Sequence, residues 1–250
     1  MDQLMISAAS GMRARMESLE MLANNLANAA TAGYKADREF YSLYVAPEAA
    51  SAGLDGFSPM PSTLPVIERH WTDFKQGTLT PTGNPLDFAL SGQGFFVVDG
   101  PNGPLYTRNG SFQLSKAGVL TTGDGYAVRS ISGTPIMASS SAPLEVSPDG
   151  VVRQSGQVLG QLAVVTFDQH GSVEKFGKNY FRVLAPEGSA KSATGTEVHQ
   201  GKLEASNVGA PESAVRLISL MRQFEMLQKA ILLSGEMGRR AVEEVARVNP

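Results

Sequence analysis

The sequence lacks cysteine, a strong net charge and long hydrophobic runs. Without cysteine, its 250 residues hold neither a disulfide nor a thiolate metal site. The 21 basic and 24 acidic residues give a net charge of −3, so the strongly basic composition typical of nucleic-acid binding is missing. No stretch reaches the roughly 20 apolar residues of a membrane-spanning helix. We therefore expect a protein that neither binds nucleic acid nor inserts into a membrane.

The first residues also lack the pattern of a cleavable signal peptide. Asp2 stands where a positive region would be, and Arg13 and Glu17 interrupt any apolar core. If the protein leaves the cytoplasm, we expect it to do so without cleavage.

No constellation of residues indicates an enzyme. The three histidines are widely spaced along the chain: His70, His170 and His199. The stretch SGQGFF lacks the third glycine and the following helix of a nucleotide-binding loop. Asp73, Asp87 and Asp99 could serve as paired carboxylates in glycosidic chemistry, but carboxylates at strand ends are usually solvated or cap turns. We expect no catalytic residue, no metal and no cofactor.

Both ends of the chain have the apolar spacing of long amphipathic helices. Residues 2–29 place apolar side chains three, four or seven apart, with Arg15 as a polar exception. Residues 211–248 do so more strictly, after a Pro211-Glu212 pair that suits a helix start. The heptad positions there are Leu217, Leu220, Phe224, Leu227, Ile231, Ser234, Gly238, Ala241, Val245 and Val248. Two terminal helices that pair as a coiled coil are therefore predicted.

Between the helices the pattern is that of β-strands. Short apolar or alternating runs are separated by turn dipeptides such as Asn102-Gly103, Asp124-Gly125 and Asp149-Gly150. Residues 46–65 are rich in Ala, Ser, Gly and Pro and are predicted to form a mobile loop, and residues 186–201 a second loose segment. The predicted fold class is α+β, with an antiparallel, sandwich- or barrel-like middle.

This pattern predicts four segments along the chain. They are an N-terminal helix over residues 1–32, a connector with the mobile loop over 33–80, a β-rich middle over 81–205, and a C-terminal helix over 206–250. A pair of isolated helices buries few large side chains relative to the entropy lost on ordering them. We therefore expect neighbouring copies or other proteins to cover the helices.

Several blocks of the sequence resemble the bacterial flagellar rod and hook proteins. LANNLANAATAGYKADREF, residues 22–40, resembles their N-terminal signature. The matching residues are Leu22, Asn24, Asn25, Leu26, Ala27, Asn28, Gly33, Tyr34 and Lys35. DFKQGTLTPTGNPLDFALSGQGFFVV, YTRNGSFQLSKAGVLTTGDGYAV and GKLEASNV resemble later blocks of the family in the same order.

The resemblance implies a structural role without catalysis. In this family the terminal helices pair in an inner coiled-coil tube, and the β-rich middle lies outside it. The subunits pass through the flagellar type III export apparatus uncleaved and associate with copies of themselves and with other rod and hook-type axial proteins. They transmit torque from the motor to the hook across the periplasm, in the basal body of the flagellum.

Within the family, the resemblance favours the proximal rod protein over its distal paralogue. Arg222, Phe224 and Glu225 match the proximal pattern, whereas the distal member more usually has Tyr in place of Phe224. The distal paralogue is the near alternative. A secreted β-domain protein that binds or acts on peptidoglycan is the alternative from another class.

The predicted assembly interface combines the apolar seams with the three asparagines of the signature. Its residues are Met12, Leu19, Leu22, Asn24, Asn25, Leu26, Asn28, Leu217, Leu220, Phe224, Leu227, Ile231 and Val245. We expect the asparagine amides to face neighbouring helices, where a polar group fixes register, or to cap the helix end. Gly33 is then expected to turn the chain toward the β-rich middle.

Overall fold

The computed structural model describes residues 3–44, 64–139, 142–167, 173–177, 179–183 and 190–248. The chain forms two compact units, each built from segments far apart in the sequence. The helical unit comprises Met1–Ala27, Asp37–Thr72 and Gly209–Pro250. The β unit comprises Asn28–Ala36 and Asp73–Val208. The chain thus passes between the units four times.

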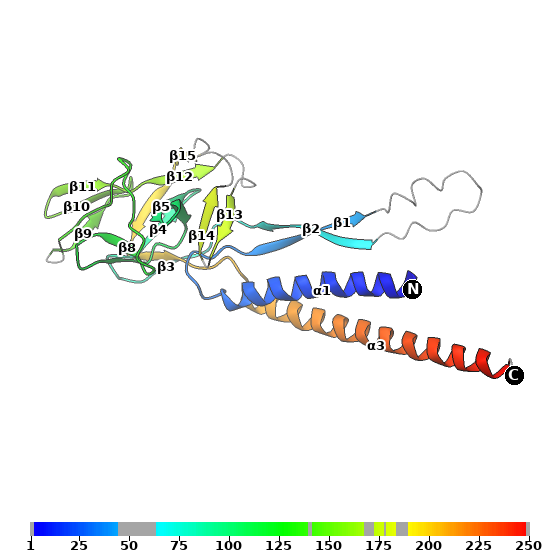
Figure 1. Cartoon of the computed structure of the whole chain (residues 1–250). Helices are drawn as coiled ribbons and strands as arrows, with labels where there is room; N and C mark the ends of the chain where they lie inside the picture. Colours follow the sequence, from blue (N-terminus) through cyan, green and yellow to red (C-terminus); the bar gives the residue numbers. More distant parts are fainter. Residues whose placement is uncertain are drawn as a thin grey trace. The chain divides into compact units, whose positions relative to one another are not determined.

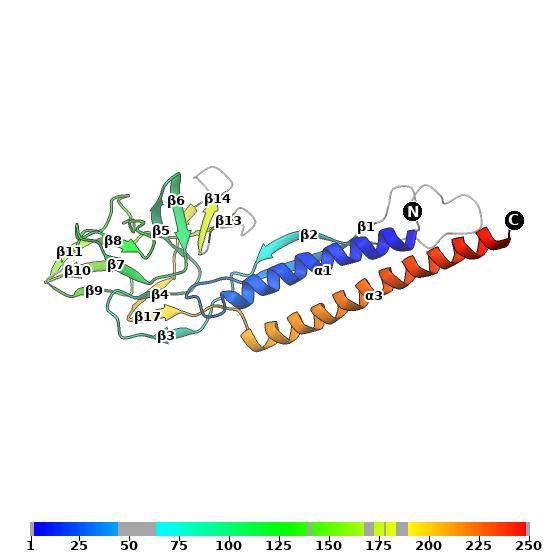
Figure 2. The same ribbon diagram turned by 60° about the horizontal axis from the view of Figure 1, so that its bottom comes forward.

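The helical unit contains two helices and one two-stranded ribbon. Helix α1 (Gln3–Ala27) and helix α3 (Ala210–Val248) lie side by side and run in opposite directions (Figures 1 and 2). Strands β1 (Asp37–Tyr44) and β2 (Leu64–Thr72) form an antiparallel ribbon that also contacts α1. Helix α1 is therefore packed on two sides, by α3 and by the ribbon.

Local signals place the helix ends. At the start of α3, the Ser213 amide donates to the Gly209 carbonyl at 2.9 Å, and Glu212 lies in the first turn, where its charge favours the helix dipole. After α1, the Thr31 amide donates to the Asn28 carbonyl at 3.0 Å, which closes a turn. Neither of these described helices is long and apolar enough to cross a membrane.

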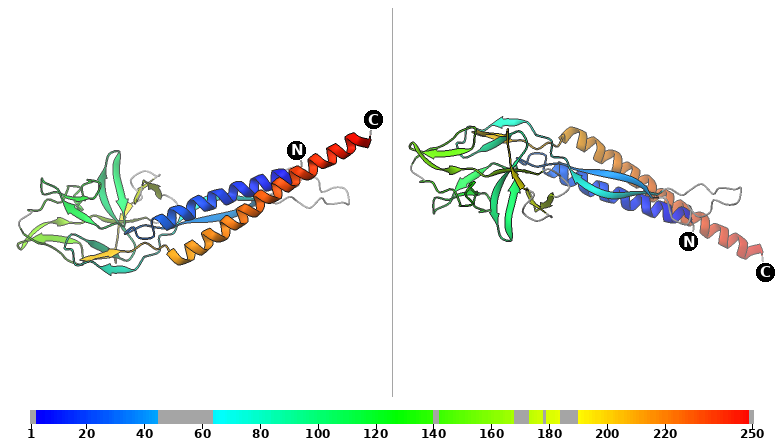
Figure 3. Two further views of the ribbon diagram at one scale, coloured as in Figure 1. Left: turned by 90° about the horizontal axis from the view of Figure 1, so that it is seen from below. Right: turned by 90° about the horizontal axis from the view of Figure 1, so that it is seen from above.

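Within the described residues, all strand pairs of the β unit are antiparallel and most strands are short. Figure 3 shows these strands from two sides. The largest sheet has the order β13-β14-β6-β5-β12-β15, a second has the order β11-β10-β9, and three pairs are β16-β4, β17-β3 and β7-β8. The strands are β3 (Leu79–Pro81), β4 (Phe88–Ser91), β5 (Phe95–Gly100), β6 (Gly103–Thr107), β7 (Phe112–Leu114), β8 (Leu120–Thr122), β9 (Leu144–Val146), β10 (Val151–Gln154), β11 (Gln157–Gln161), β12 (Val164–Phe167), β13 (Val173–Phe176), β14 (Tyr180–Val183), β15 (Ala190–Ser192), β16 (Glu197–Gln200) and β17 (Lys202–Glu204).

Two hydrophobic clusters fill the β unit. The larger one includes Phe88, Phe96 and Leu120, which are fully buried. The smaller one centres on Phe95, whose ring meets those of Phe167 and Phe181 at centroid distances of 5.7 and 5.5 Å. Interlocked aromatic rings of this kind give a well-packed core. The β unit therefore has a core of its own.

The predicted α+β class, with a helix at each end and a β-rich middle, is confirmed. So are the hairpins at Asn102-Gly103, between β5 and β6, and at Asp149-Gly150, between β9 and β10. The prediction of a loose segment over 186–201 was wrong, because β15 and β16 lie within it and pair with β12 and β4. Strands of three or four residues are too short to show a clear alternation.

The predicted four-segment division stays a prediction, although the structure adds a fact to it. The ribbon β1–β2 belongs to the helical unit, where sequence patterning suggested only a connector. Most of the predicted mobile loop over 46–65 lies outside the described residues.

Candidate assembly interface

The least exposed residues of α3 follow the predicted heptads. Leu220 is buried, and Leu217, Phe224, Leu227 and Ile231 are half-buried. These residues lie three or four apart and so share one side of the helix. We call them the α3 seam. The predicted seam residue Val245 lies within α3, but its side chain is outside the described part of the structure.

Large apolar side chains also occupy two further sides of α3. Ile218, Met221 and Leu232 are spaced three and eleven apart, and each is about half exposed or more. Val215, Met226, Leu233 and Met237 form another row at spacings of eleven, seven and four, and all four are exposed by 60% or more. At 3.6 residues per turn these spacings define two stripes, which we call the α3 flanks. Helix α3 is apolar well beyond its seam.

The most buried stripe of α1 differs from the predicted seam. Leu22 is buried as expected, whereas Met12, Leu19 and Leu26 are only half-buried. The other buried members of the stripe are small or polar: Ala14, Ser18 and Asn25. The Ser18 hydroxyl donates to the Ala14 carbonyl at 3.0 Å, which satisfies it within the helix. A heptad pattern of large apolar residues could not reveal this stripe.

Asn25, at one end of that stripe, contacts the ribbon. Its side-chain amide donates to the Asp37 carbonyl at 2.8 Å, and its oxygen accepts from the Asp37 amide at 3.0 Å. Asn25 therefore completes the backbone hydrogen bonding of the first residue of β1, within the same chain. The stripe thus contacts the ribbon at Asn25, and the ribbon is a packing partner of α1 that sequence reasoning missed.

The other two signature asparagines lie differently. Asn28 follows the last residue of α1, and its side-chain oxygen accepts from the Thr31 hydroxyl at 3.3 Å, so it stabilises the turn at the helix end. Asn24 is exposed on α1. A role for Asn24 toward a neighbouring helix stays a prediction.

The segment after α1 is held in the β unit by a tight backbone turn. Gly33 has a φ of +69°, a conformation that costs little only for glycine. Its amide donates to the Glu204 carbonyl at 2.7 Å, and a Cβ at this position would clash with the backbone of Arg108 and Asn109. Gly33 thus lies in a tight turn that allows close backbone contact, and its expected role in directing the chain toward the β-rich middle stays a prediction.

A buried group of charges, which we call the joint, lies next to this turn. Glu204 accepts from Lys35 Nζ at 2.5 Å and from Arg108 Nη1 at 3.2 Å, and all three side chains are buried (side-chain exposure at most 3%). The Gly77 amide also donates to Glu204 at 2.9 Å. Burial lowers the pKa of Lys35, although the Glu204 carboxylate opposes part of that effect. The Glu204 carboxylate is therefore the shared ion-pair partner of two buried cations, Lys35 and Arg108.

Asn207 adds backbone links to the joint. Its side-chain oxygen accepts from the Ala36 amide at 2.7 Å, and its amide donates to the Asp73 carbonyl at 2.6 Å. Lys35 in turn donates to the Lys75 carbonyl at 2.7 Å. The joint thereby connects three backbone segments by hydrogen bonds, close to the points where the chain leaves or enters the β unit.

The carboxylates considered for glycosidic chemistry each have separate structural partners. Asp73 is buried and accepts from the Lys75 amide at 3.1 Å. Asp87 accepts from Asn84 at 3.1 Å, and Asp99 accepts from Arg129 Nε at 2.6 Å. In the described part of the chain, no three His, Asp or Glu side chains gather as metal ligands do. His199 lies 3.7 Å from Glu197, and His170 is outside the described residues.

The chain thus combines helical ends, a β-rich middle and a terminal helix with exposed apolar flanks. Family models match three stretches of it: "Flagella basal body rod protein" over residues 5–35, "Flagellar hook protein FlgE/F/G D1 domain" over 89–159, and "Flagellar basal body rod FlgEFG protein C-terminal" over 199–243.

Known relatives align over nearly the whole chain. The flagellar basal-body rod protein FlgF of Caulobacter vibrioides is 33% identical over the full length of both chains. FlgG of the same species is 33% identical, covering 94% of this chain and 96% of its own, and FlgG of Bacillus subtilis is 32% identical, covering 92% and 94%. The chain belongs to the flagellar basal-body rod protein family.

Membership settles the general role. The chain is a structural subunit of the flagellar basal-body rod. It acts with the other axial proteins of the rod and hook. The alternative of a peptidoglycan-binding or peptidoglycan-acting protein is not favoured by any of these matches.

Proposed function

We propose that the chain associates with copies of itself and with other axial proteins through α1 and α3, which pair as a coiled coil inside the rod. The observation that carries this proposal is the apolar character of α3 on three sides. Rows of exposed large apolar side chains on a helix surface mark sites of protein–protein contact. Since α1 is only 25 residues long and α3 is 39, α1 is too short to cover α3 along its length.

The flanks of α3 supply the association energy. Burial of a large apolar side chain contributes about 1.5–3 kcal/mol, and the flanks hold seven such side chains that are about half exposed or more. The charged residues of α3 lie mainly between the flanks: Arg222, Glu225, Lys229, Glu236 and Arg240. We infer that neighbouring helices pack on the flanks, with these charges setting their register.

The joint gives the β unit a firm hold on the segments that lead to the helices. Lys35 lies in the segment that follows α1, and Glu204 lies in the segment that precedes α3. Their buried ion pair therefore connects these two segments. Torque that reaches the helices would then pass to the β unit through a hydrogen-bonded cluster and four covalent crossings. The protein has no catalytic step in this proposal.

Among rod positions, we propose the proximal one. Arg222, Phe224 and Glu225 carry the proximal pattern, and Phe224 is half-buried in the α3 seam. Tyr at this position would bring a hydroxyl that needs a hydrogen-bonding partner in the seam. Export is proposed to proceed through the type III apparatus without cleavage.

The experiment compares one exposed residue of a flank with an equally exposed residue of the β unit. Leu233→Glu places a charge on an α3 flank, and Val158→Glu does so on β11, where the exposed fractions are 60% and 61%. Because both side chains face water in the monomer, both variants should fold, with unchanged circular dichroism and melting temperature. We expect Leu233→Glu to abolish self-association in sedimentation and motility in a strain lacking the chain. Val158→Glu should retain both. Equal behaviour of the two variants would refute the flank as the association surface.

A further inference from the structure

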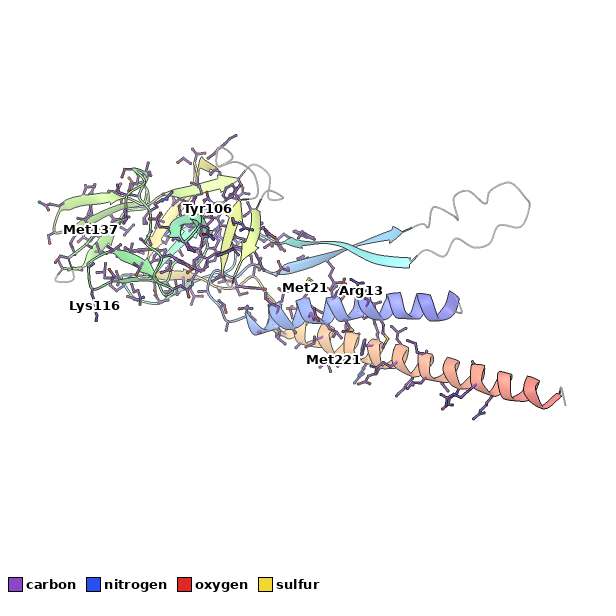
Figure 4. The ribbon with its side chains drawn as sticks, in the orientation of Figure 1. Arg13, Met21, Tyr106, Lys116, Met137 and Met221 are labelled. Atoms are coloured by element: carbon purple, nitrogen blue, oxygen red, sulfur yellow. The ribbon has the colours of Figure 1, made fainter. Side chains whose placement is uncertain are left out.

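Four methionines of the helical unit are exposed, whereas Met12 and Met21 are half-buried. Met16 on α1 and Met221 on α3 are each 49% exposed, and Met226 and Met237 on α3 are 62% and 67% exposed. We call these four the helical methionines. In the described part of the β unit, Met137 is exposed to a similar extent, at 61%. Figure 4 marks Met221 on α3 and Met137 in the β unit.

The helical methionines lie where association is proposed to occur. Met221 belongs to one α3 flank, together with Ile218 and Leu232. Met226 and Met237 belong to the other. Methionine is flexible and apolar, so it suits contacts with non-identical neighbours. Its thioether is also the most easily oxidised group in a chain without cysteine.

We propose that the helical methionines are a modification site for a hydroperoxide, and that their oxidation blocks association of the subunit before it is assembled. The sulfur lone pair attacks the terminal peroxide oxygen, the O–O bond breaks and an S–O bond forms. With hydrogen peroxide, the sulfur loses two electrons and the peroxide leaves as water after proton transfer. The inference rests on the proposed association through α1 and α3.

The physical effect follows from the polarity of the product. A sulfoxide carries a strongly polar oxygen that water solvates in the monomer, and an apolar helix interface offers it no donor. Each sulfoxide should therefore weaken association by about tenfold or more. Helix packing in the assembled rod would shield the same sulfurs, so only the free subunit would be sensitive. Reduction of the sulfoxides by a thiol-dependent reductase would restore association.

The experiment uses the full-length chain and hydrogen peroxide. Oxidation at each methionine is followed by peptide mass spectrometry, and association by sedimentation before and after treatment. The quadruple variant M16L/M221L/M226L/M237L keeps the size and apolarity of each side chain, and Met137→Leu is the matched control. For each chain, association after treatment is compared with that of the same chain before treatment. We expect a loss in the wild type and in Met137→Leu, and no change on treatment in the quadruple variant, whatever its untreated level of association.

The outcomes separate this inference from the proposed function. If the untreated wild type does not associate, the proposed function fails. If the wild type associates and keeps its association after complete oxidation of the four residues, the inference is overturned and the proposed function stands. Equal sensitivity of the quadruple variant and the wild type would overturn it as well. Rapid oxidation of the four residues in assembled rods would contradict the shielding.

Discussion

The β unit and the helical unit differ in how much of their large apolar side chains they bury. The β unit buries Phe88, Phe96 and Leu120 completely within its own core. In the described part of the helical unit, only Leu22 and Leu220 are buried large aliphatic residues. Large apolar side chains are instead exposed along α3, as at Leu232 and Leu233. The β unit buries its large apolar residues within a single copy, and we propose that neighbouring subunits cover those of the helical unit.

Among the substitutions that test this comparison, we expect the largest loss of stability from one in the joint. Glu204→Ala would leave Lys35 and Arg108 buried without a counter-charge, and the loss of one partner of a buried ion pair typically costs about 3–5 kcal/mol. We expect the free energy of unfolding of the β unit to fall by that amount in denaturant titrations. Glu145→Ala on β9, where the side chain is exposed, should change it by less than about 0.5 kcal/mol. Similar losses in both variants would mean that the joint is not a stabilising element.

A smaller effect is expected where α1 meets the ribbon. Asn25→Ala removes two hydrogen bonds to the half-buried backbone of Asp37, and each such bond typically contributes about 0.5–1.5 kcal/mol. The neighbouring substitution Asn24→Ala affects an exposed side chain and should cost far less. Hydrogen exchange at the Asp37 amide measures the difference directly. Equal exchange rates in the two variants would show that Asn25 does not hold the ribbon.

The smallest effect concerns the pH dependence of the β unit. Burial, and then the hydrogen bond to Asp124 at 2.6 Å, raises the pKa of Tyr180 above its ordinary value of 10. Above pH 10 the unfolded chain therefore loses the phenolic proton while the folded chain keeps it. Since the folded state then binds more protons, its stability falls as pH rises, by at most about 1.4 kcal/mol per pH unit. Unfolding curves between pH 9 and about pH 11 should show this decline in the wild type and a weaker one in Tyr180→Phe. Parallel curves would contradict the assignment to Tyr180.

The features that the sequence predicted correctly are those that depend on local patterns in the chain. The heptads that include Leu217, Leu220 and Phe224 predicted α3, because a helix repeats over short distances in the chain. Turn pairs such as Asp149-Gly150 predicted hairpins for the same reason. The seam residues were all placed on helices, and their part in association stays a prediction.

What could not be predicted depends on contacts between distant segments. Lys35 and Glu204 are 169 residues apart, and no local sequence pattern at either residue predicts a buried ion pair. Asn25 binds backbone atoms of Asp37. Because every residue has these backbone atoms, the identity of the partner residue does not reveal the contact. The asparagines of the signature are now explained in part: Asn25 holds the ribbon, and Asn28 stabilises the turn that follows α1.

Deletion of α3 tests the central claim most directly. A chain that ends at Val208 keeps every segment of the β unit and loses the flanks. The measurement is a thermal unfolding curve of this variant beside the wild type, together with rod assembly in cells that express only the variant. We predict that the melting transition of the β unit is preserved and that no rods form. Rods that assemble without α3, or a β unit that fails to fold without it, would contradict the account.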